Sequence, residues 1–306
     1  MRMARVLISG ASGLLGSALM PSLESHGYEV VRLVRRPPRI GEEIQWDPMR
    51  EIPPQLVSGF DAVINLSGES VSGRWTEERK NSIRTSRVIS TQNLSHALAQ
   101  TENPPQTFVC ASAIGFYGNR GEEVLTEESS SGAGFLAEVS REWEAATEPA
   151  AHAGIRTVNL RIGIVLGRKG GALKQMLLPF RLGLGGKIGS GRQWFSWIHI
   201  DDLVAAVLHI LGTVERTAPS PSREICGPVN MTAPNPVTNA EFTKALGAAL
   251  NRPTIFSVPA FAARLAFGEF ADEGLLASAR VTPQKLLGTE FAFRFPHLHT
   301  ALGDLL

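Results

Sequence analysis

A stretch of eleven residues near the start of the chain, 6–16, constrains the fold more than any other. Residues suited to a buried strand run directly into three glycines spaced three apart, and an apolar helical pattern follows. Gly10 would permit a tight turn, Gly13 would let the backbone approach a pyrophosphate, and Gly16 would let the helix pack close on the strand. The unpaired N–H groups at the helix N-terminus would hold the phosphates. The contacts predicted from this dinucleotide site are Gly10, Ser12, Gly13, Leu14, Leu15 and Gly16.

Composition narrows the class of partner. The chain has 306 residues, a net charge of +1 and 19% charged residues, which gives no general attraction to nucleic acid or to an anionic membrane. No window approaches the roughly eighteen continuous apolar residues of a membrane span, and no signal peptide is evident. Neither Cys110 nor Cys226 is expected in a disulfide or a metal site. We therefore expect a cytoplasmic protein that acts on a small molecule and binds no nucleic acid, membrane or metal.

The first half of the chain alternates between strand and helix patterns, which indicates an α/β fold with a parallel sheet. The later part is mostly helical, and a threonine followed by a glutamate three residues later, at 238 and 241, predicts a capping box. The expected strands are 5–8, 29–34, 44–46, 61–66, 107–113, 156–161, 195–200 and 224–226. The expected helices follow the glycine turn or span 76–99, 135–153, 173–182, 201–211, 238–250, 261–267, 274–279 and 297–305.

The end of the second strand bears on the choice of dinucleotide. A site for the unphosphorylated dinucleotide would place an acidic residue here for the ribose 2′-OH, but the sequence reads Val34, Arg35, Arg36. A guanidinium matches the geometry of a 2′-phosphate. Arg35, helped by Ser12, therefore predicts NADP(H), and the alternative is a solvated basic loop.

Several motifs of the sequence resemble those of a known protein family. They are 10–16, 65–69, 112–118, 171–173, 177–186, 189–193, 197–203, 253–259, 283–287 and 295–296. In this order they resemble the extended short-chain dehydrogenase/reductases, and more narrowly the atypical epimerase family called family 39U. The resemblance runs the length of the chain.

The resemblance implies a Rossmann-type doubly wound parallel sheet with a small, mostly helical C-terminal domain. We expect residues 1–222 to form the NADP-binding domain, with substrate-side excursions at 163–200 and a linker at 217–222. Residues 223–306 would form a substrate-side lid. The further cofactor contacts that the resemblance implies are Leu66, Ser67, Gly68, Arg87 and Gly163. For Arg87 the alternative is an exposed cation on a helix.

The catalytic residues are where this sequence departs from the superfamily, whose enzymes use a Ser or Thr with a Tyr-x-x-x-Lys pair. Ser112 matches the serine, but the helix starting at residue 135 has neither Tyr nor Lys. Tyr117, one of two tyrosines in the chain, could substitute or could be structural. His199, with an ordinary pKa of about 6.5, could serve as acid or base. Alternatively it orients backbone, with Asp201 as a helix cap.

These observations favour an NADP(H)-binding atypical short-chain dehydrogenase/reductase. It would be an oxidoreductase similar to the nucleoside-diphosphate-sugar epimerases, acting on a small polar carbonyl or sugar-like substrate. The missing Tyr-x-x-x-Lys pair leaves the enzymatic activity itself open. The alternative is a non-catalytic regulatory or redox-sensing protein that binds NADP(H). The oligomeric state is open as well, with a homodimer as one possibility.

Overall fold

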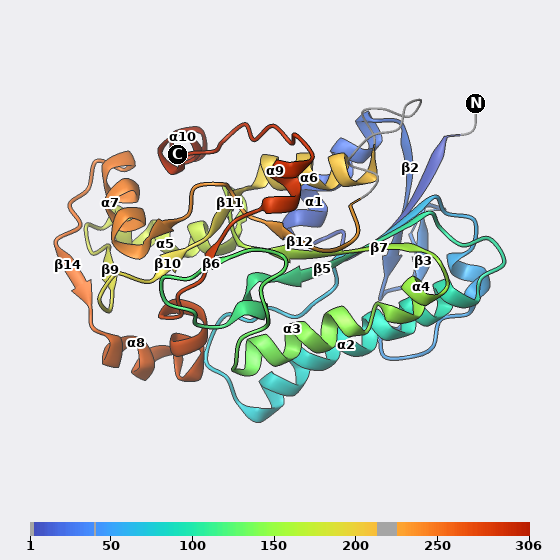
Figure 1. Ribbon diagram of the computed structural model, residues 1–306, viewed down its shortest axis with the longest axis horizontal. Coiled ribbons are helices and arrows are strands. Elements are labelled where there is room, and N and C mark those ends of the chain that lie inside the picture. Colours follow the sequence, from blue (N-terminus) through green and yellow to red (C-terminus); the bar gives the residue numbers. More distant parts are fainter. Residues whose placement is uncertain (1–2, 40, 213–224) are drawn as a thin grey trace.

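The computed structural model describes residues 3–39, 41–212 and 225–306. At its centre lies a seven-stranded sheet in the order β12-β7-β5-β4-β1-β2-β3, and every pair of neighbours is parallel (Figure 1). The strands are β1 (Ala4–Ser9), β2 (Tyr28–Val34), β3 (Glu43–Gln45), β4 (Ala62–Asn65), β5 (Thr107–Ala113), β7 (Arg156–Ile162) and β12 (Gly227–Met231). The strand order reverses direction between β1 and β4, where such sheets bind their ligands. The predicted doubly wound parallel sheet is confirmed.

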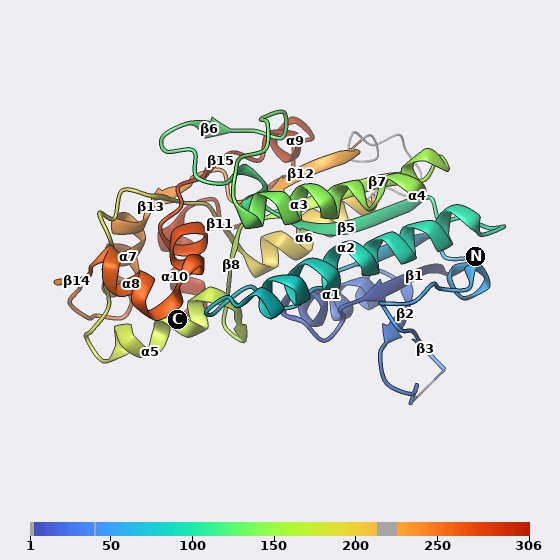
Figure 2. The ribbon, with the colours of Figure 1, turned by 90° about the horizontal axis from the view of Figure 1, so that it is seen from below.

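Helices cover both faces of the sheet (Figure 1). One face carries α1 (Leu14–Ser25) and α6 (Ile200–Leu211), and the other carries α2 (Glu77–Gln100), α3 (Phe135–Ala145) and α4 (Glu148–His152), which run in front of the sheet in Figure 2. Side chains of a strand point alternately to the two faces. Val6 and Ile8 therefore join the core under α1 and α6, whereas Leu7 joins the core under α2 and α4. The glycine motif thus leads from a fully buried strand into α1.

The helix predicted over 135–153 is two helices, α3 and α4. Pro149 has no N–H to donate, and the Thr147 hydroxyl donates to the Glu144 carbonyl oxygen at 2.7 Å. Both features end the hydrogen-bond ladder between the two helices. Gly154 follows α4 with a φ of +83° and closes it, as the sequence predicts.

Most of the remaining elements gather at the end of the molecule opposite the N-terminus (Figure 1). They are α5 (Gly171–Arg181), α7 (Asn239–Ala249), α8 (Ala260–Phe267) and α10 (Leu298–Leu305), with short strands in pairs, whereas α9 (Gln284–Gly288) lies against β12 of the central sheet. The pairs are β8 (Ile164–Gly167) with β11 (Trp197–His199), β9 (Gly186–Ile188) with β14 (Phe256–Val258), β10 (Trp194–Phe195) with β13 (Val237–Thr238), and β6 (Val124–Leu125) with β15 (Arg280–Val281). Short helical turns lie at η1 (Pro54–Val57), η2 (Ile114–Tyr117) and η4 (Ala271–Leu275). Within the described ranges, no helix combines the length and the apolar character that crossing a bilayer requires.

Three predicted elements differ. The strand over 195–200 is two strands, β10 and β11, because the Ser196 hydroxyl between them donates to the Ala279 carbonyl oxygen at 2.7 Å. The helix over 274–279 is wrong: η4 is a π-helical turn that ends at Leu275, and the Ser278 N–H donates to Asn119 instead of to a helix carbonyl. The strand predicted at 224–226 begins at Gly227 as β12.

The predicted linker 217–222, residue 224 and the boundary between 222 and 223 lie outside the described residues. After that boundary the chain returns to the central sheet, because β12 pairs with β7. The predicted capping box of α7 is confirmed, since the Thr238 hydroxyl accepts from the Glu241 N–H and the Glu241 carboxylate accepts from the Thr238 N–H.

Candidate functional site

A cavity of about 820 Å³ lies at the carboxyl ends of β1, β2 and β4. This is the place where the strand order of the sheet reverses, which is the usual ligand site of such folds. Seven of the residues predicted from sequence line the cavity: Gly10, Ser12, Gly13, Arg35, Leu66, Ser67 and Gly68. The structure therefore brings the glycine turn, the end of the second strand and the end of the fourth strand into one hollow.

The glycine turn packs against the end of β4 without spare room. Gly10 has a φ of +70°, and a Cβ added to it would lie 2.6 Å from the carbonyl carbon and oxygen of Leu66. A Cβ on Gly16 would overlap the carbonyl oxygen of Gly10. The N-cap of α1 is Gly13, which supplies no side-chain cap, and the first turn of the helix carries no acidic residue. The positive end of α1 is thus left open toward the cavity, which suits a phosphate.

Three arginines stand at the end of β2, and they differ in their partners. Glu43 of β3 binds Arg36 through two hydrogen bonds of 2.7 and 2.8 Å and pairs with Arg32 at 3.2 Å. The Arg36 guanidinium thereby lowers the pKa of the Glu43 carboxyl to about 2. Arg35 is exposed, lines the cavity and has no ion pair or side-chain hydrogen bond to any described residue. Arg35 is therefore the cation at this edge that is left to meet an anion.

Two buried groups hold the loop that follows β4. The Asn65 side-chain oxygen accepts from the Ser9 hydroxyl at 2.5 Å and from the Ser67 N–H at 3.3 Å. The Arg87 side chain of α2 donates to the carbonyl oxygens of Glu69 at 2.8 Å and Ile83 at 3.0 Å. Burial lowers the pKa of the Arg87 guanidinium to about 10. Arg87 thus supports the cavity-lining loop instead of standing free on its helix.

The sequence did not single out the hydroxyl side chains of α2 that close the cavity. Ser82, Thr85 and Ser86 line it, at the spacing that places side chains on one face of a helix. That spacing could have been recognised in the sequence. The role of Glu43 could not have been predicted, because its pairing with Arg32 depends on the register of β2 against β3.

Besides Arg87, four of the predicted cofactor contacts lie outside the lining of this cavity. Leu14 packs against Gly170 and Gly171 at the start of α5, and Leu15 packs on the core under α1. Gly16 is buried in the turn itself. A Cβ on Gly163 would lie 2.8 Å from the carbonyl oxygen of Ser196. These four residues fix how the neighbouring segments pack around the cavity.

Ser112 belongs to a buried series of polar side chains that are linked by hydrogen bonds. Its hydroxyl donates to the Glu144 carboxylate of α3 at 2.7 Å. The same carboxylate takes two hydrogen bonds of 2.8 Å from the Arg161 guanidinium, which also lies 3.4 Å from the centre of the Phe116 ring. The side chains of Glu144 and Arg161 are 12% and 4% exposed. The serine hydroxyl is therefore held by an internal ion pair.

Tyr117 lies at the other end of this series of hydrogen-bonded side chains and is fully buried. Its hydroxyl accepts from Arg161 at 3.0 Å and lies within donating distance of the Asn230 side-chain oxygen, at 2.7 Å, and the Thr126 carbonyl oxygen, at 2.9 Å. Burial raises the pKa of the phenol. Such contacts suit a structural hydroxyl in its neutral form.

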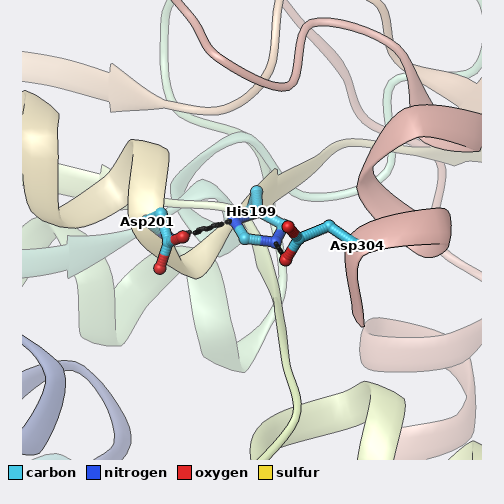
Figure 3. Close-up of side chains that lie close together, drawn as sticks. All are labelled: His199, Asp201 and Asp304. Carbon is cyan, nitrogen blue, oxygen red and sulfur yellow. Dashed lines mark hydrogen bonds and ion pairs between the residues drawn. The ribbon is translucent and has the colours of Figure 1, made fainter. Parts of the chain in front are cut away.

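His199 is the N-cap of α6 (Figure 3). Its Nδ1 accepts from the Asp201 N–H at 3.1 Å, so the predicted cap Asp201 is wrong and the histidine takes that role. Its Nε2 is buried without a hydrogen-bond partner and lies 3.5 Å from the Asp304 carboxylate of α10, while the Asp201 carboxylate lies 4.0 Å from Nδ1. Burial lowers the pKa of the imidazole. The two carboxylates approach different nitrogens of the ring. This arrangement fits an imidazole that accepts at Nδ1 and carries its proton on Nε2 better than it fits a single metal ion.

The helix expected to carry Tyr and Lys begins against the C-terminal part of the chain. The N–H groups of Phe135 and Leu136 in the first turn of α3 donate to the Glu273 carboxylate at 2.8 and 2.7 Å. Four residues before Glu273, Glu269 pairs with Lys80 of α2 at 2.9 Å. The segment around η4 is therefore fastened across the start of both helices.

Comparison with known protein families gives two matches. Residues 6–225 match the NAD dependent epimerase/dehydratase family, and residues 258–305 match a domain of unknown function, DUF1731. The first match includes the glycine turn, Arg35 and the loop after β4. The second begins within β14 and includes η4 and α10.

Individual relatives cover almost the whole chain. The epimerase family protein Mb2239 of Mycobacterium bovis is 44% identical over 98% of this chain and 97% of its own length. The human epimerase family protein SDR39U1 is 37% identical over 99% of both chains. A crystal structure of the human protein with NADPH superimposes with a TM-score of 0.88 at 36% identity, covering 98% of each chain. The resemblance seen in the sequence motifs is confirmed.

Proposed function

The chain belongs to the NAD dependent epimerase/dehydratase family, and from this premise we propose that it is an NADP(H)-binding oxidoreductase of the short-chain dehydrogenase/reductase type. One observation carries the choice of cofactor: Arg35 is exposed at the cavity and unpaired among the described residues, while Glu43 holds both of its arginine neighbours. The relative crystallised with NADPH supports the same choice. A cytoplasmic location remains a prediction.

The cavity fits the cofactor. The glycine turn leaves no volume for side chains and opens the N-terminus of α1, which would hold the pyrophosphate. Arg35 would bind the 2′-phosphate, with Ser12 beside the turn as a further donor. Leu66, Ser67 and Gly68 would contact the adenosine side, on a loop whose shape Arg87 maintains.

When bound, NADP(H) supplies a hydride to a carbonyl carbon or takes one from an alcohol. We assign the substrate to the polar carbonyl compounds, sugars among them. Ser112, Tyr117 and His199 remain candidates for catalysis, but their contacts favour positioning. Ser112 ties β5 to α3 through Glu144, Tyr117 anchors the loop after β5, and His199 joins α6 to α10.

The binding of each nucleotide tests the cofactor assignment. We expect NADPH to bind more tightly than NADH, measured by calorimetric titration of the purified protein. Arg35→Gln should weaken NADPH binding by about 10- to 100-fold, since a hydrogen bond to a charged group contributes about 1.5 to 3 kcal/mol. It should leave NADH binding within about twofold. Arg50→Gln is the matched control, because the Arg50 side chain is 84% exposed and its ion pair is with the exposed Asp47. Equal affinities for the two nucleotides would overturn the assignment.

A second function has one observation in its favour, the absence of Tyr and Lys from α3. On that basis the protein would bind NADP(H) as a regulator and report the redox state without turnover. A panel of carbonyl compounds, followed by NADPH absorbance, separates the two functions. Consumption of NADPH that is lost in Ser112→Ala excludes the regulator, whereas tight NADPH binding without consumption across the panel favours it.

A further inference from the structure

Exposed apolar side chains concentrate in two segments of the C-terminal half. Among the described residues, nine of the sixteen large apolar side chains that are strongly exposed lie within 178–184 and 255–267. They are Leu178, Leu182, Leu184, Ile255, Phe256, Val258, Phe261, Leu265 and Phe267, with exposures from 37% to 82%. We call them the apolar end. Such a concentration in a folded protein marks a binding surface.

The fold brings the two segments together. The β9–β14 pair joins them, with Phe256 opposite Gly186, two residues after Leu184. On α8, Phe261 and Leu265 are four residues apart and so share one face. Figures 1 and 2 both show α5, α8 and β14 at the same end of the molecule. The apolar end is therefore one region built from two helices and a strand pair.

The two segments that carry these side chains contain charged residues of one sign. Segments 171–191 and 251–268 contain five basic residues and no Asp or Glu: Lys174, Arg181, Lys187, Arg252 and Arg264. Arg264 is neutralised by Asp272, with a contact of 2.9 Å, and the other four are exposed. The Arg252 guanidinium donates to the Arg181 carbonyl oxygen, which places this cation beside the end of α5. A ligand that complements this region is apolar and carries a negative group.

Both helices of the apolar end touch segments of the cofactor cavity. At the start of α5, a Cβ added to Gly170 or Gly171 would lie 3.4 or 2.9 Å from the side chain of Leu14, which follows the cavity-lining Gly13 directly. At the end of α8, the Leu265 carbonyl oxygen accepts from Arg74, five residues after the cavity-lining Glu69. The two helices of the apolar end thus lie against residues that are close in sequence to the lining of the proposed cofactor site.

We propose that the apolar end binds an acyl-like chain of the substrate, whose carbonyl lies at the cofactor and which also carries an anionic group. The proposal rests on the proposed oxidoreductase function and adds an apolar chain to the polar carbonyl compound assigned above. A second copy of the chain fits less well, because a two-fold contact places a patch against itself and would bring the four exposed cations against four more.

The test uses cis-parinaric acid, a fluorescent eighteen-carbon carboxylic acid, titrated into the protein saturated with NADPH. We expect saturable binding of one molecule per chain, displaced by dodecanoic acid and not by butanoic acid. The double variant Phe261→Asp with Leu265→Asp should weaken this binding by about tenfold or more, because it removes two apolar contacts and adds negative charge. Both side chains are more than 70% exposed, so the variant retains its core. Leu287→Asp on α9, 46% exposed, is the matched control.

NADPH affinity, measured on the same samples, separates this proposal from the proposed function. Loss of NADPH binding in the wild type is a failure of the cofactor assignment. Intact NADPH binding without saturable parinaric acid binding overturns the apolar-chain proposal, and so does equal weakening by Leu287→Asp. Sedimentation with phosphatidylglycerol vesicles, or a dimer that dissociates in the double variant, would instead assign the surface to a membrane or to a second copy and likewise overturn it.

Discussion

Replacing Gly10 by alanine tests the packing on which the cofactor site depends. Gly10 combines two constraints, a positive φ of +70° and a Cβ position only 2.6 Å from the Leu66 backbone and 2.9 Å from the Ser67 nitrogen. The atoms in the way belong to the backbone at the end of a central strand, so they cannot move aside as a flexible side chain could. Gly27, just after α1, has nearly the same φ, +78°, and nothing within 4 Å of its Cβ position. Gly27→Ala is therefore a control that carries the backbone strain without the collision.

The two costs can be separated. A left-handed backbone costs an L-residue about 1 to 2 kcal/mol, and both variants incur this cost. Forcing extra volume into a packed site adds about 1 to 3 kcal/mol, and only Gly10→Ala incurs that. We expect Gly10→Ala to lower the free energy of unfolding by about 2 to 5 kcal/mol and Gly27→Ala by about 1 to 2 kcal/mol. Because Leu66 and Ser67 line the cavity, Gly10→Ala should also weaken NADPH binding by about tenfold or more.

Urea unfolding followed by circular dichroism measures the first quantity, and calorimetric titration with NADPH measures the second. The comparison requires equal m-values for the variants, so that a change in midpoint reports stability. If Gly10→Ala is no less stable than Gly27→Ala, the close approach of the turn to β4 is wrong. If it is less stable but binds NADPH as well as the wild type, the turn is not where the cofactor binds.

Three other changes test separate parts of the molecule. Glu144→Gln takes the carboxylate from the buried Arg161 and should lower the free energy of unfolding in urea by about 3 kcal/mol; an unchanged midpoint contradicts the ion pair. Burial lowers the pKa of His199, so the unfolded state binds its proton first, and stability falls as pH drops below about 6.5. In His199→Gln the melting temperature should fall less between pH 6.5 and 5 than in the wild type, and parallel curves would refute this. Thr238→Ala removes the cap of α7 and should cost about 1 kcal/mol, read from the same urea transitions.

The sequence predicted the sheet and the residues that line the cavity at its edge because both depend on local patterns. Continuous apolar runs identified β1, β4 and β5, and alternation with helices predicted parallel strands. The errors concentrate where long-range bonds override local preference. The residues of 274–279 have a helical pattern, yet Ser278 bonds with the loops at Asn119 and Gly121, which are more than 150 positions away. Such contacts have no signature within the segment itself.

The candidate site divides in the same way. The sequence predicted the positions of Gly10, Gly13 and Arg35, because a turn and a strand end fix them locally. All three line the cavity. The partners of the neighbouring arginines were not readable, since Glu43 reaches them only through the β2–β3 register. Nor was the environment of Ser112, because the Glu144 carboxylate comes from a helix 32 positions later. Local motifs therefore predicted where a residue lies, whereas they carry no information about partners that come from distant segments.

The start of α3 bears on where a substrate could obtain a proton. In the superfamily that this chain resembles, the corresponding helix carries the tyrosine that exchanges a proton with the substrate. Here the first N–H groups of α3 are held by Glu273 from the C-terminal part, and Gly134 before them has a φ of +106° with a Cβ position 2.9 Å from that carboxylate. The two tyrosines of the chain are Tyr28 on β2 and Tyr117, whose hydroxyl is engaged internally. A carbonyl reduced in this protein must therefore receive its proton from a source other than a tyrosine of α3, whose first turn is bound by Glu273 from the C-terminal part.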